Sequence, residues 1–492
     1  MFKVVSPESI GIKSAWIEKF IKHLQGKGLP MHDVVIMRGN AVCCEAYWKP
    51  FHKDFCHRQY SQTKSFTSIA IGLLEEEGKI SLDDKIADYF RDKIKRKLPE
   101  YLENQTIRDM LMMTTTSYNG VNWLVAENKD MVDIYFHQTE ITHPAGTIWR
   151  YDSNGSHILS MLVEKLSGKS LLAYLKEKLF NKMDAFQNAQ ILKGPVGESW
   201  GDSAMICTPN DMLSFARLVM NYGTWQGERL MNEQYLREAT SALTALTEFG
   251  NSIVGYGYQI WKLRNNSFGF LGLGKQLTVC NPEKDIILVL NSDCQGSPYD
   301  VYGIIFDYYF EDIVENITET VLPEDPAARE SLRNLCDSLT LHSIHGIPKT
   351  QIQENIDGKT FLALGENAQG ITKFCFSFDG KNGGVFRYTN AQGDKELPFA
   401  INANEFCKFP QFGYSNEYGG LPTTDGYLYD CAVSAAWMDN TRFQIYVQVI
   451  DKYFGNCTMT FCFKDEFVGV EMRKYAEGFM EEYQGSFVAK QI

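Results

Sequence analysis

The sequence lacks the long apolar runs of a membrane protein, since no eighteen consecutive apolar residues occur among its 492 residues. Residues 1–7 contain no apolar h-region and no small-residue cleavage site, so no secretory signal is expected. Twelve cysteines are present, yet no two of them form a Cys-x-x-Cys pair. Together these absences predict a cytoplasmic protein with reduced thiols and no membrane partner.

Clusters of a single charge are also missing, because no block of five or more like charges occurs along the chain. The net charge is −13, and nucleic acids and anionic membranes select clustered Lys and Arg, so neither partner is expected. The nine histidines form no His-x-x-x-His or His-Cys cluster, and we interpret His52, Cys56 and His57 as loop residues. The sequence therefore predicts no metal site and no cofactor.

What the sequence does contain is typical of a globular chain with a large core, with 44% apolar and 13% aromatic residues. Its length predicts two or three domains. Runs rich in Val and Ile around Gly39-Asn40 predict a β-hairpin, and strand patterns return between residues 255 and 291. We therefore predict a first domain over residues 1–321, with one mixed sheet interrupted by a helical insert at about residues 62–245.

A change of pattern follows residues 322–326, which contain two prolines and two acidic residues and are the predicted linker. Beyond them Phe374, Phe376 and Phe378 alternate with polar residues, and similar alternation recurs up to residue 472. This spacing, with Asp-Gly and Gly-Gly turns, predicts a C-terminal β-barrel-like domain over residues 327–492. Its role is either a structural cap or oligomer surface, or the shaping of a substrate cleft, and the oligomeric state is left open.

The most informative motif is Ser61-Gln62-Thr63-Lys64, at the start of a predicted helix. Apolar residues follow it at helical spacing, namely Phe66, Ile69, Ala70, Leu73 and Leu74. Residues i and i+3 share a helix face, so the Lys64 ammonium can reach the Ser61 oxygen. Because an alcohol is a weak nucleophile without a base beside it, the spacing is interpreted as a nucleophile and its base. The alternative is an N-cap serine followed by a solvated lysine.

Two further segments contain residues suited to a cleft. Tyr151 lies in the Gly-, Ser- and Asn-containing stretch 144–160, just before an apolar helix, where its phenol can point into a cleft. Residues 270–279 place Gly272 and Gly274 at a strand start, which permits close approach by a backbone or a ligand. Taken singly, the tyrosine is equally an aromatic anchor, and the glycines are equally a bulge or turn.

Together and in this order, the three motifs resemble the serine β-lactamase and penicillin-binding-protein superfamily. The branch they resemble is the class C β-lactamase-like one, which contains esterases, D-amino-acid peptidases and amide hydrolases such as 6-aminohexanoate-dimer hydrolase. The resemblance covers about residues 6–317, and further segments support it: 65–68, 77–84, 106–115, 144–147 and 207–212. It implies an α/β (α+β) β-lactamase/transpeptidase-like fold, with a mixed or antiparallel sheet flanked by helices, an all-helical insert, and an added C-terminal antiparallel β domain.

The resemblance also implies roles for individual residues. Ser61 matches the acylated nucleophile, Lys64 its base, and Tyr151 the tyrosine that passes a proton to the leaving group. Ser153 occupies the place of a family asparagine, and its hydroxyl can still donate a hydrogen bond to a substrate carbonyl. The backbone N–H groups of Ser61 and Gln276 match the oxyanion hole.

The clearest departure from the family lies at 273–275, where Leu273, Gly274 and Lys275 replace a Lys-Thr-Gly triplet. The family lysine provides a cation for a substrate carboxylate, which Leu273 cannot do. Lys275 lies two residues further along, and alternate residues of a strand share a face, so it is within reach of the site. We nevertheless interpret it as a solvated or structural lysine.

The sequence thus predicts a serine hydrolase that acts through an acyl-enzyme on a small-molecule ester or amide. The loss of the family lysine favours an esterase or small-amide hydrolase over a β-lactamase. Two alternatives remain. One is a β-lactamase or D-amino-acid peptidase that uses the same catalytic residues, and the other is a non-catalytic protein that binds a ligand or partner through the former active-site cleft and the β domain.

Overall fold

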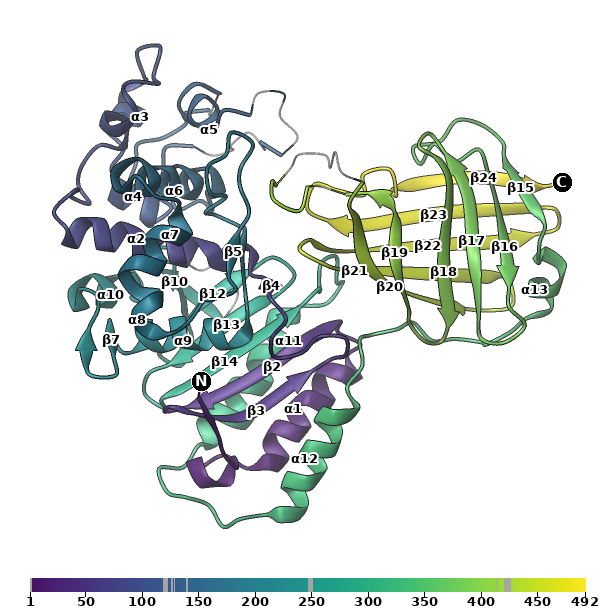
Figure 1. Cartoon of the computed structure of the whole chain (residues 1–492), viewed down its shortest axis with the longest axis horizontal. Coiled ribbons are helices and arrows are strands. Elements are labelled where there is room, and N and C mark those ends of the chain that lie inside the picture. The colour runs from purple at the N-terminus through teal and green to yellow at the C-terminus, as the bar shows by residue number, and fades with distance from the viewer. Residues whose placement is uncertain are drawn as a thin grey trace. The chain divides into compact units, whose positions relative to one another are not determined.

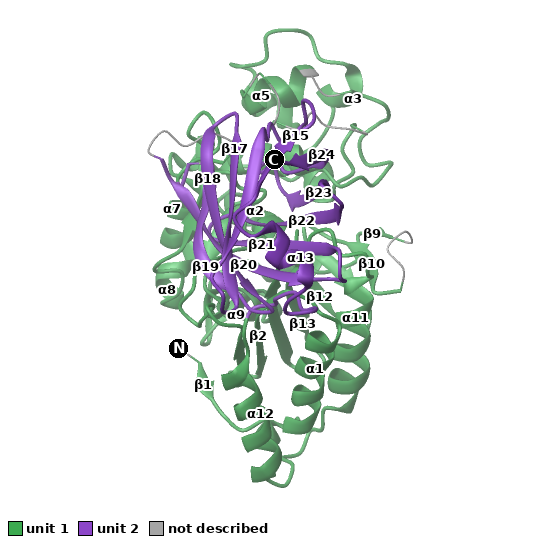
Figure 2. Cartoon of the chain, turned by 90° about the vertical axis from the view of Figure 1, so that its right-hand side faces the viewer, with its two compact units in different colours: residues 1–340, 417–419 green, residues 341–416, 420–492 purple. Residues whose placement is uncertain are grey.

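The computed structural model describes residues 2–117, 123–124, 127, 129–138, 140–246, 251–413, 415–419 and 426–492. The chain forms two compact units, coloured green and purple in Figure 2: residues 1–340 with 417–419, and residues 341–416 with 420–492. None of the helices described is both long enough and apolar enough to traverse a bilayer.

Unit 1 is built on a mixed sheet, which has nine strands in the described part of the chain (Figure 1). Every strand pair is antiparallel except β1 with β3. In spatial order the strands are β1 Lys3–Val4, β3 Ala41–Tyr47, β2 Met31–Arg38, β14 Ile286–Ser292, β13 Gln276–Asn281, β12 Phe268–Gly272, β11 Trp261–Leu263, β10 Ile253–Tyr256 and β9 Thr244–Ala245. Arg38 of β2 lies opposite Ile286 of β14, so the sheet joins two halves that are distant in sequence, as predicted.

Helices cover both faces of this sheet because its strands are apolar on both faces. Val34 and Ile36 of β2 belong to the core cluster formed with α1 (Ser14–Gly26) and α11 (Val301–Tyr308). Val35 and Met37 alternate with them and are equally buried. The helix α9 (Pro209–Met220) contacts β2, β13 and β14. Continuous apolar strands of this kind are typical of a sheet enclosed between helical layers.

The segment between β3 and β9 is mostly helical, in agreement with the predicted insert. Its α-helices are α2 Thr63–Glu76, α3 Glu100–Glu103, α4 Ile107–Leu111, α5 Met131–Asp133, α6 Ser153–Ser167, α7 Leu171–Leu175, α8 Asn181–Met183, α9 and α10 Glu233–Ala239. The central pair is α2 and α6, which contact each other and lie close together in Figure 1. The segment also contains short strands that the pattern does not predict: β4 His57–Arg58, β5 Gln190–Ile191, β6 Met205–Cys207, β7 Thr224–Trp225 and β8 Glu228–Arg229.

The two units divide between Thr340 and Leu341, later along the chain than the predicted linker at 322–326. The reason is the helix α12 (Pro326–Ser338), which packs against α1 and β3 of unit 1 and lies beside α1 in Figures 1 and 2. Residues 417–419 also belong to unit 1, where the backbone of Lys193 pairs with Glu417 and Gly419. Proline-rich composition marks the start of α12 and not the end of the unit.

Unit 2 is a ten-stranded sheet within the described residues, and all neighbours in its order are antiparallel. An additional parallel pairing of β18 with β20 closes it into a barrel, which confirms the predicted C-terminal antiparallel β domain. In spatial order the strands are β18 Gly393–Ile401, β17 Gly383–Asn390, β16 Lys373–Phe378, β15 Thr360–Ala363, β24 Gly485–Gln491, β23 Phe467–Ala476, β22 Phe454–Lys464, β21 Arg442–Ile450, β20 Leu428–Trp437 and β19 Glu405–Phe412.

Aromatic rings fill the interior of unit 2, as the alternation of Phe residues predicts. Phe374 and Phe376 of β16 are buried, and the Phe376 ring centroid lies 4.9 Å from that of Phe461 and 5.2 Å from that of Phe386. Edge-on and offset ring pairs at such distances add to the free energy gained from burial. Because rings from several strands meet there, the interior is a packed core.

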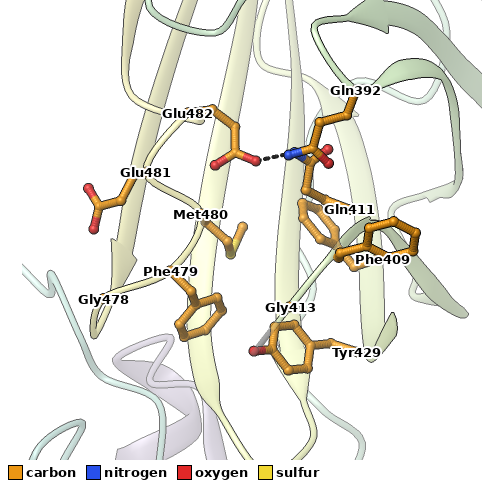
Figure 3. A pocket seen from close by; sticks show the side chains of 11 residues that line it. Gln392, Phe409, Gln411, Gly413, Tyr429, Gly478, Phe479, Met480, Glu481 and Glu482 are labelled. Atoms are coloured by element: carbon orange, nitrogen blue, oxygen red, sulfur yellow. Dashed lines mark hydrogen bonds between the residues drawn. The ribbon is translucent and has the colours of Figure 1, made fainter. Parts of the chain in front are cut away.

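A small pocket of about 210 Å³ opens in unit 2 (Figure 3). Its walls include the rings of Phe409, Tyr429 and Phe479. Gln411 donates a hydrogen bond to Glu482, and Figure 3 shows this pair above the rings of Phe479 and Tyr429. The pocket is therefore polar on one side and aromatic on the other.

Candidate active site

Ser61 lies in a single 3₁₀ turn, Tyr60–Gln62, immediately before α2. The preceding Tyr60 is fully buried and has a φ of 47°, a left-handed conformation that costs a non-glycine residue about 1 kcal/mol or more. The guanidinium of Arg58 lies 4.1 Å above the Tyr60 ring, and Thr63 Oγ1 donates to the Tyr60 carbonyl at 2.6 Å. The sharp turn held by these contacts leaves Ser61 half-buried, ahead of the helix that the sequence predicts it to open.

Lys64 directs its ammonium at the Ser61 hydroxyl, as the spacing predicts. Nζ lies 3.0 Å from Ser61 Oγ and donates a second hydrogen bond to the Asp202 carbonyl at 2.8 Å. Only 1% of the Lys64 surface is exposed, so these bonds hold the amine without competition from bulk water. The Asp202 carboxylate lies further off, with Oδ2 3.8 Å from Nζ.

Tyr151 precedes α6 and lies close to the same lysine. The Lys64 Nζ is 5.0 Å from the centroid of the Tyr151 ring, which stacks on Trp261 at 5.8 Å and remains 41% exposed. Asp152 caps α6 by accepting a hydrogen bond from Gly155 N at 2.9 Å, and a second one from Thr115 Oγ1 at 2.9 Å. The cap fixes the backbone next to Tyr151, and the structure thereby brings Ser61, Lys64 and Tyr151 together.

Asp152 is a half-buried carboxyl, and desolvation raises its pKa above the ordinary value. Its hydrogen bonds from Gly155 and Thr115 and the positive charge of Lys64 act in the opposite direction. Ser153, the next residue, is half-buried and forms the first turn of α6, two positions after Tyr151. The N-terminus of α6 thus fixes the positions of Asp152 and Ser153 as well as that of Tyr151.

The third motif forms the turn between β12 and β13, where Gly272 pairs with Gln276 across the loop 273–275. A Cβ on Gly272 would lie 2.5 Å from the Gln59 carbonyl oxygen, so only glycine allows the strand to approach the turn that carries Ser61. Gly274 has a φ of 74°, and Leu273 is 43% exposed at the tip. Leu273 and Gly274 are therefore part of the same neighbourhood as Ser61.

Gln276 holds this turn in place with its buried side chain. Its Nε2 donates to the carbonyls of Leu273 at 2.8 Å and Ser292 at 2.7 Å, while its Oε1 accepts from Ser292 N at 3.0 Å. The side chain is fully engaged with backbone groups, so only the main chain of Gln276 is left to face a substrate. The oxyanion role that the family resemblance implies for the Gln276 backbone N–H stays a prediction.

Lys275 extends toward Tyr302 of α11. Its Nζ lies 3.7 Å above the ring centroid of Tyr302, and burial lowers the pKa of its ammonium. Its backbone has a φ of 68°, the left-handed conformation that completes the turn. Tyr302 is half-buried, and its desolvation together with the nearby Tyr151 raises its pKa. Lys275 therefore packs against an aromatic ring of α11.

Three buried charged residues beside the site are absent from the sequence-based prediction, namely His157, Glu198 and Asp202. His157 belongs to α6, whereas Glu198 and Asp202 belong to the loop before β6. The only signal in the sequence is the position of His157 six residues after Tyr151, and it does not identify the partners. These residues come together through the tertiary fold.

Comparison with known proteins gives a family match and several relatives. A family model described as Beta-lactamase matches residues 17–306. The 6-aminohexanoate-dimer hydrolase of Paenarthrobacter ureafaciens is 23% identical over 276 residues, which cover 52% of this chain and 70% of that protein. Penicillin-binding protein 4* of Bacillus subtilis is 29% identical over 149 residues, which cover 27% of this chain and 30% of that protein.

Among solved structures, a D-amino acid amidase from Ochrobactrum anthropi SV3 aligns with a TM-score of 0.50 at 15% identity, covering 61% of this chain and 98% of that one. A Bacillus anthracis protein provisionally named as a 6-aminohexanoate-dimer hydrolase aligns with a TM-score of 0.52 at 17% identity, covering 63% of this chain and 86% of that one. At these identities the two structures support a shared fold and no more.

Proposed function

Because the chain belongs to the beta-lactamase family and is a hydrolase of that type, we propose that it cleaves a small amide or ester through an acyl-enzyme on Ser61. The observation that carries the proposal is the 3.0 Å separation of Lys64 Nζ and Ser61 Oγ in a buried environment. The separation suits both directions of proton transfer, since a neutral amine accepts the serine proton and the resulting ammonium donates back.

In the proposed reaction Ser61 Oγ attacks the substrate carbonyl and its proton passes to Lys64. The tetrahedral oxyanion is held by the backbone N–H groups of Ser61 and Gln276. The proton then passes through the Tyr151 hydroxyl to the leaving amine or alcohol, whose bond to the carbonyl carbon breaks. Water, deprotonated by the same pair, releases the acyl group and restores Ser61. Ser153 supplies a further donor for the substrate.

The surroundings of Ser61 favour an uncharged acyl group. Leu273 offers an apolar side chain where related enzymes carry a lysine, and the cation of Lys275 is engaged with Tyr302. Tyr151 and Trp261 add a stacked aromatic wall. The name of the Paenarthrobacter relative supports an amide between small acids and amines as the substrate class. We therefore favour a small amide, with simple esters as convenient substrates for assay.

Labelling with a fluorophosphonate probe tests the proposal most directly. The probe should modify Ser61, identified by mass spectrometry of the labelled peptide, and should inactivate hydrolysis in parallel. Unlabelled protein should then be assayed with short-chain esters, D-amino-acid amides and a chromogenic cephalosporin. An unlabelled Ser61 in the folded protein would favour a non-catalytic binding protein, and faster turnover of the cephalosporin than of esters would favour a β-lactamase.

Replacing Leu273 by Lys is expected to shift specificity toward substrates that carry a carboxylate. A partly exposed ion pair contributes up to about 1 kcal/mol, which corresponds to about a five-fold gain in kcat/KM for a cephalosporin. The ratio of cephalosporin to uncharged-ester turnover measures the effect. Leu273→Met is the matched neutral control, and an equal change in both variants would show that charge at this position is irrelevant.

A further inference from the structure

Four charged side chains form a buried row that ends at the nucleophile. Glu198 Oε1 lies 3.2 Å from His157 Nε2, and His157 Nδ1 lies 3.1 Å from Asp202 Oδ1. Asp202 Oδ2 in turn lies 3.8 Å from Lys64 Nζ, which binds Ser61 Oγ. At most 7% of any of these residues is exposed. The charges therefore alternate in sign along a row that water does not screen.

Each carboxylate faces a different nitrogen of one imidazole: Glu198 through a hydrogen bond with Nε2, and Asp202 through a charge pair with Nδ1. Burial alone would lower the pKa of His157, but its contacts with Asp202 and Glu198 outweigh burial and raise the pKa to about 9. Burial likewise opposes the shift in Asp202, whose pKa is lowered by His157 and by the charge of Lys64. His157 is thus an imidazolium near neutral pH, and it lies beside the ionised carboxylate of Asp202.

The position of the Asp202 carboxylate is the important detail. Its Oδ1 faces His157 Nδ1 as a charge pair at 3.1 Å, and neither atom forms a hydrogen bond within the part of the chain that the structure describes. Lys64 bonds the backbone carbonyl of Asp202 at 2.8 Å and not its carboxylate. The carboxylate is therefore turned toward the histidine, which leaves the Lys64 ammonium directed at Ser61.

We propose, on the basis of the function proposed above, that His157 and Glu198 are positioning residues that hold the Asp202 carboxylate away from Lys64. Without the imidazolium, the full negative charge of Asp202 would act on the ammonium, draw Nζ from Ser61 Oγ and retain the proton that catalysis must pass on. Lys64 also faces the Tyr151 ring and the half-buried carboxyl of Asp152.

His157→Gln tests the proposal because glutamine keeps hydrogen-bonding capacity without a positive charge. We expect kcat to fall about ten-fold with little change in KM, and the acid limb of the kcat/KM profile to move up by about one pH unit. Fluorophosphonate labelling of Ser61 should slow by the same factor. Glu198→Gln should shift both quantities in the same direction by less, and it provides the test if His157→Gln does not fold.

A double variant distinguishes an electrostatic effect of the Asp202 carboxylate from a structural effect of losing His157. If the freed Asp202 carboxylate causes the defect, His157→Gln with Asp202→Asn should recover much of the rate lost in His157→Gln alone. A purely structural role predicts instead that the two losses add. His32→Gln is a matched control, since His32 is also fully buried in unit 1 and its Nδ1 lies 2.7 Å from the Nε2 of another histidine, His57.

The charge state of His157 can be tested independently of activity. A histidine with a pKa of about 9 when folded and about 6.5 when unfolded stabilises the fold fully below about pH 6.5, and this stability is lost as the pH rises through about 9. The Tm difference between the protein and His157→Gln should therefore be largest near pH 6 and shrink above pH 9.

The results of these experiments distinguish failure of the positioning role from failure of the proposed hydrolase function. Normal labelling of Ser61 in the unmodified protein, with unchanged rate and pH profile in His157→Gln and Glu198→Gln, would overturn the positioning role alone. A Tm difference that does not depend on pH, or additive losses in the double variant, would also overturn it. Absence of labelling in the unmodified protein would instead remove the proposed function on which the role rests.

Discussion

Replacing Ser61 by Ala is expected to reduce hydrolysis of a p-nitrophenyl ester by at least about 10⁴-fold, because the hydroxyl is the only atom proposed to form the acyl-enzyme. The fold should be unaffected, since Ser61 is half-buried in a turn that Tyr60 and Thr63 hold by their own contacts. The measurement is kcat/KM with active-site titration, alongside the Tm of the purified variant.

Ser65 provides the matched control, because it is a serine one helical turn further along α2. Its Oγ donates to the Gln259 carbonyl at 2.8 Å and is buried, so Ser65→Ala should lower the free energy of unfolding by about 1 kcal/mol and leave kcat/KM within about three-fold. Activity of Ser61→Ala within a few-fold of the unmodified protein would exclude Ser61 as the nucleophile.

Replacing Lys64 by Met is expected to lower kcat by about a thousand-fold, because a positioned general base contributes about 10²–10⁴-fold. Methionine keeps most of the side-chain volume in a fully buried position, so loss of packing is a minor part of the effect. The rate constants of both acylation and deacylation should fall. The pre-steady-state release of p-nitrophenol measures acylation, and the slow phase that follows measures deacylation.

Lys165→Met is the control for removing a lysine from the same unit. Lys165 lies on the exposed end of α6 and pairs with Asp92 at 2.5 Å, a surface ion pair that contributes little to stability. Its activity should stay within about two-fold. A Lys64→Met variant with near-normal kcat would show that another group takes the serine proton.

Much of the fold follows from short-range patterns. The hairpin β2–β3, the strand β14 and the alternating Phe residues of β16 appear in the sequence because apolar side chains recur at the period of the element that buries them. The Ser61–Lys64 pair is equally local, since one helical turn joins the two residues. In such cases the nearest neighbours in sequence determine the geometry.

Other features depend on contacts that no local pattern contains. The left-handed φ of Tyr60 is held by Arg58, and the direction of Lys275 is set by Tyr302 on a distant helix. The helix α12 belongs to unit 1 because its apolar face meets α1 and β3, although proline-rich residues precede it. The row from Glu198 to Lys64 likewise joins separate elements, and a buried charge becomes interpretable only when its partner is known.

The pairing of β2 with β14 has a consequence for how the chain is made. Because Arg38 lies opposite Ile286, the centre of the sheet cannot close until a ribosome has released residues beyond β14. Pairings of such high contact order form slowly, whereas the helices of the insert contain mostly local contacts. During synthesis the β2–β3 hairpin therefore keeps an unpaired strand edge until β14 is available. Nascent chains with such edges are prone to associate wrongly, and this is the stage at which chaperones would act.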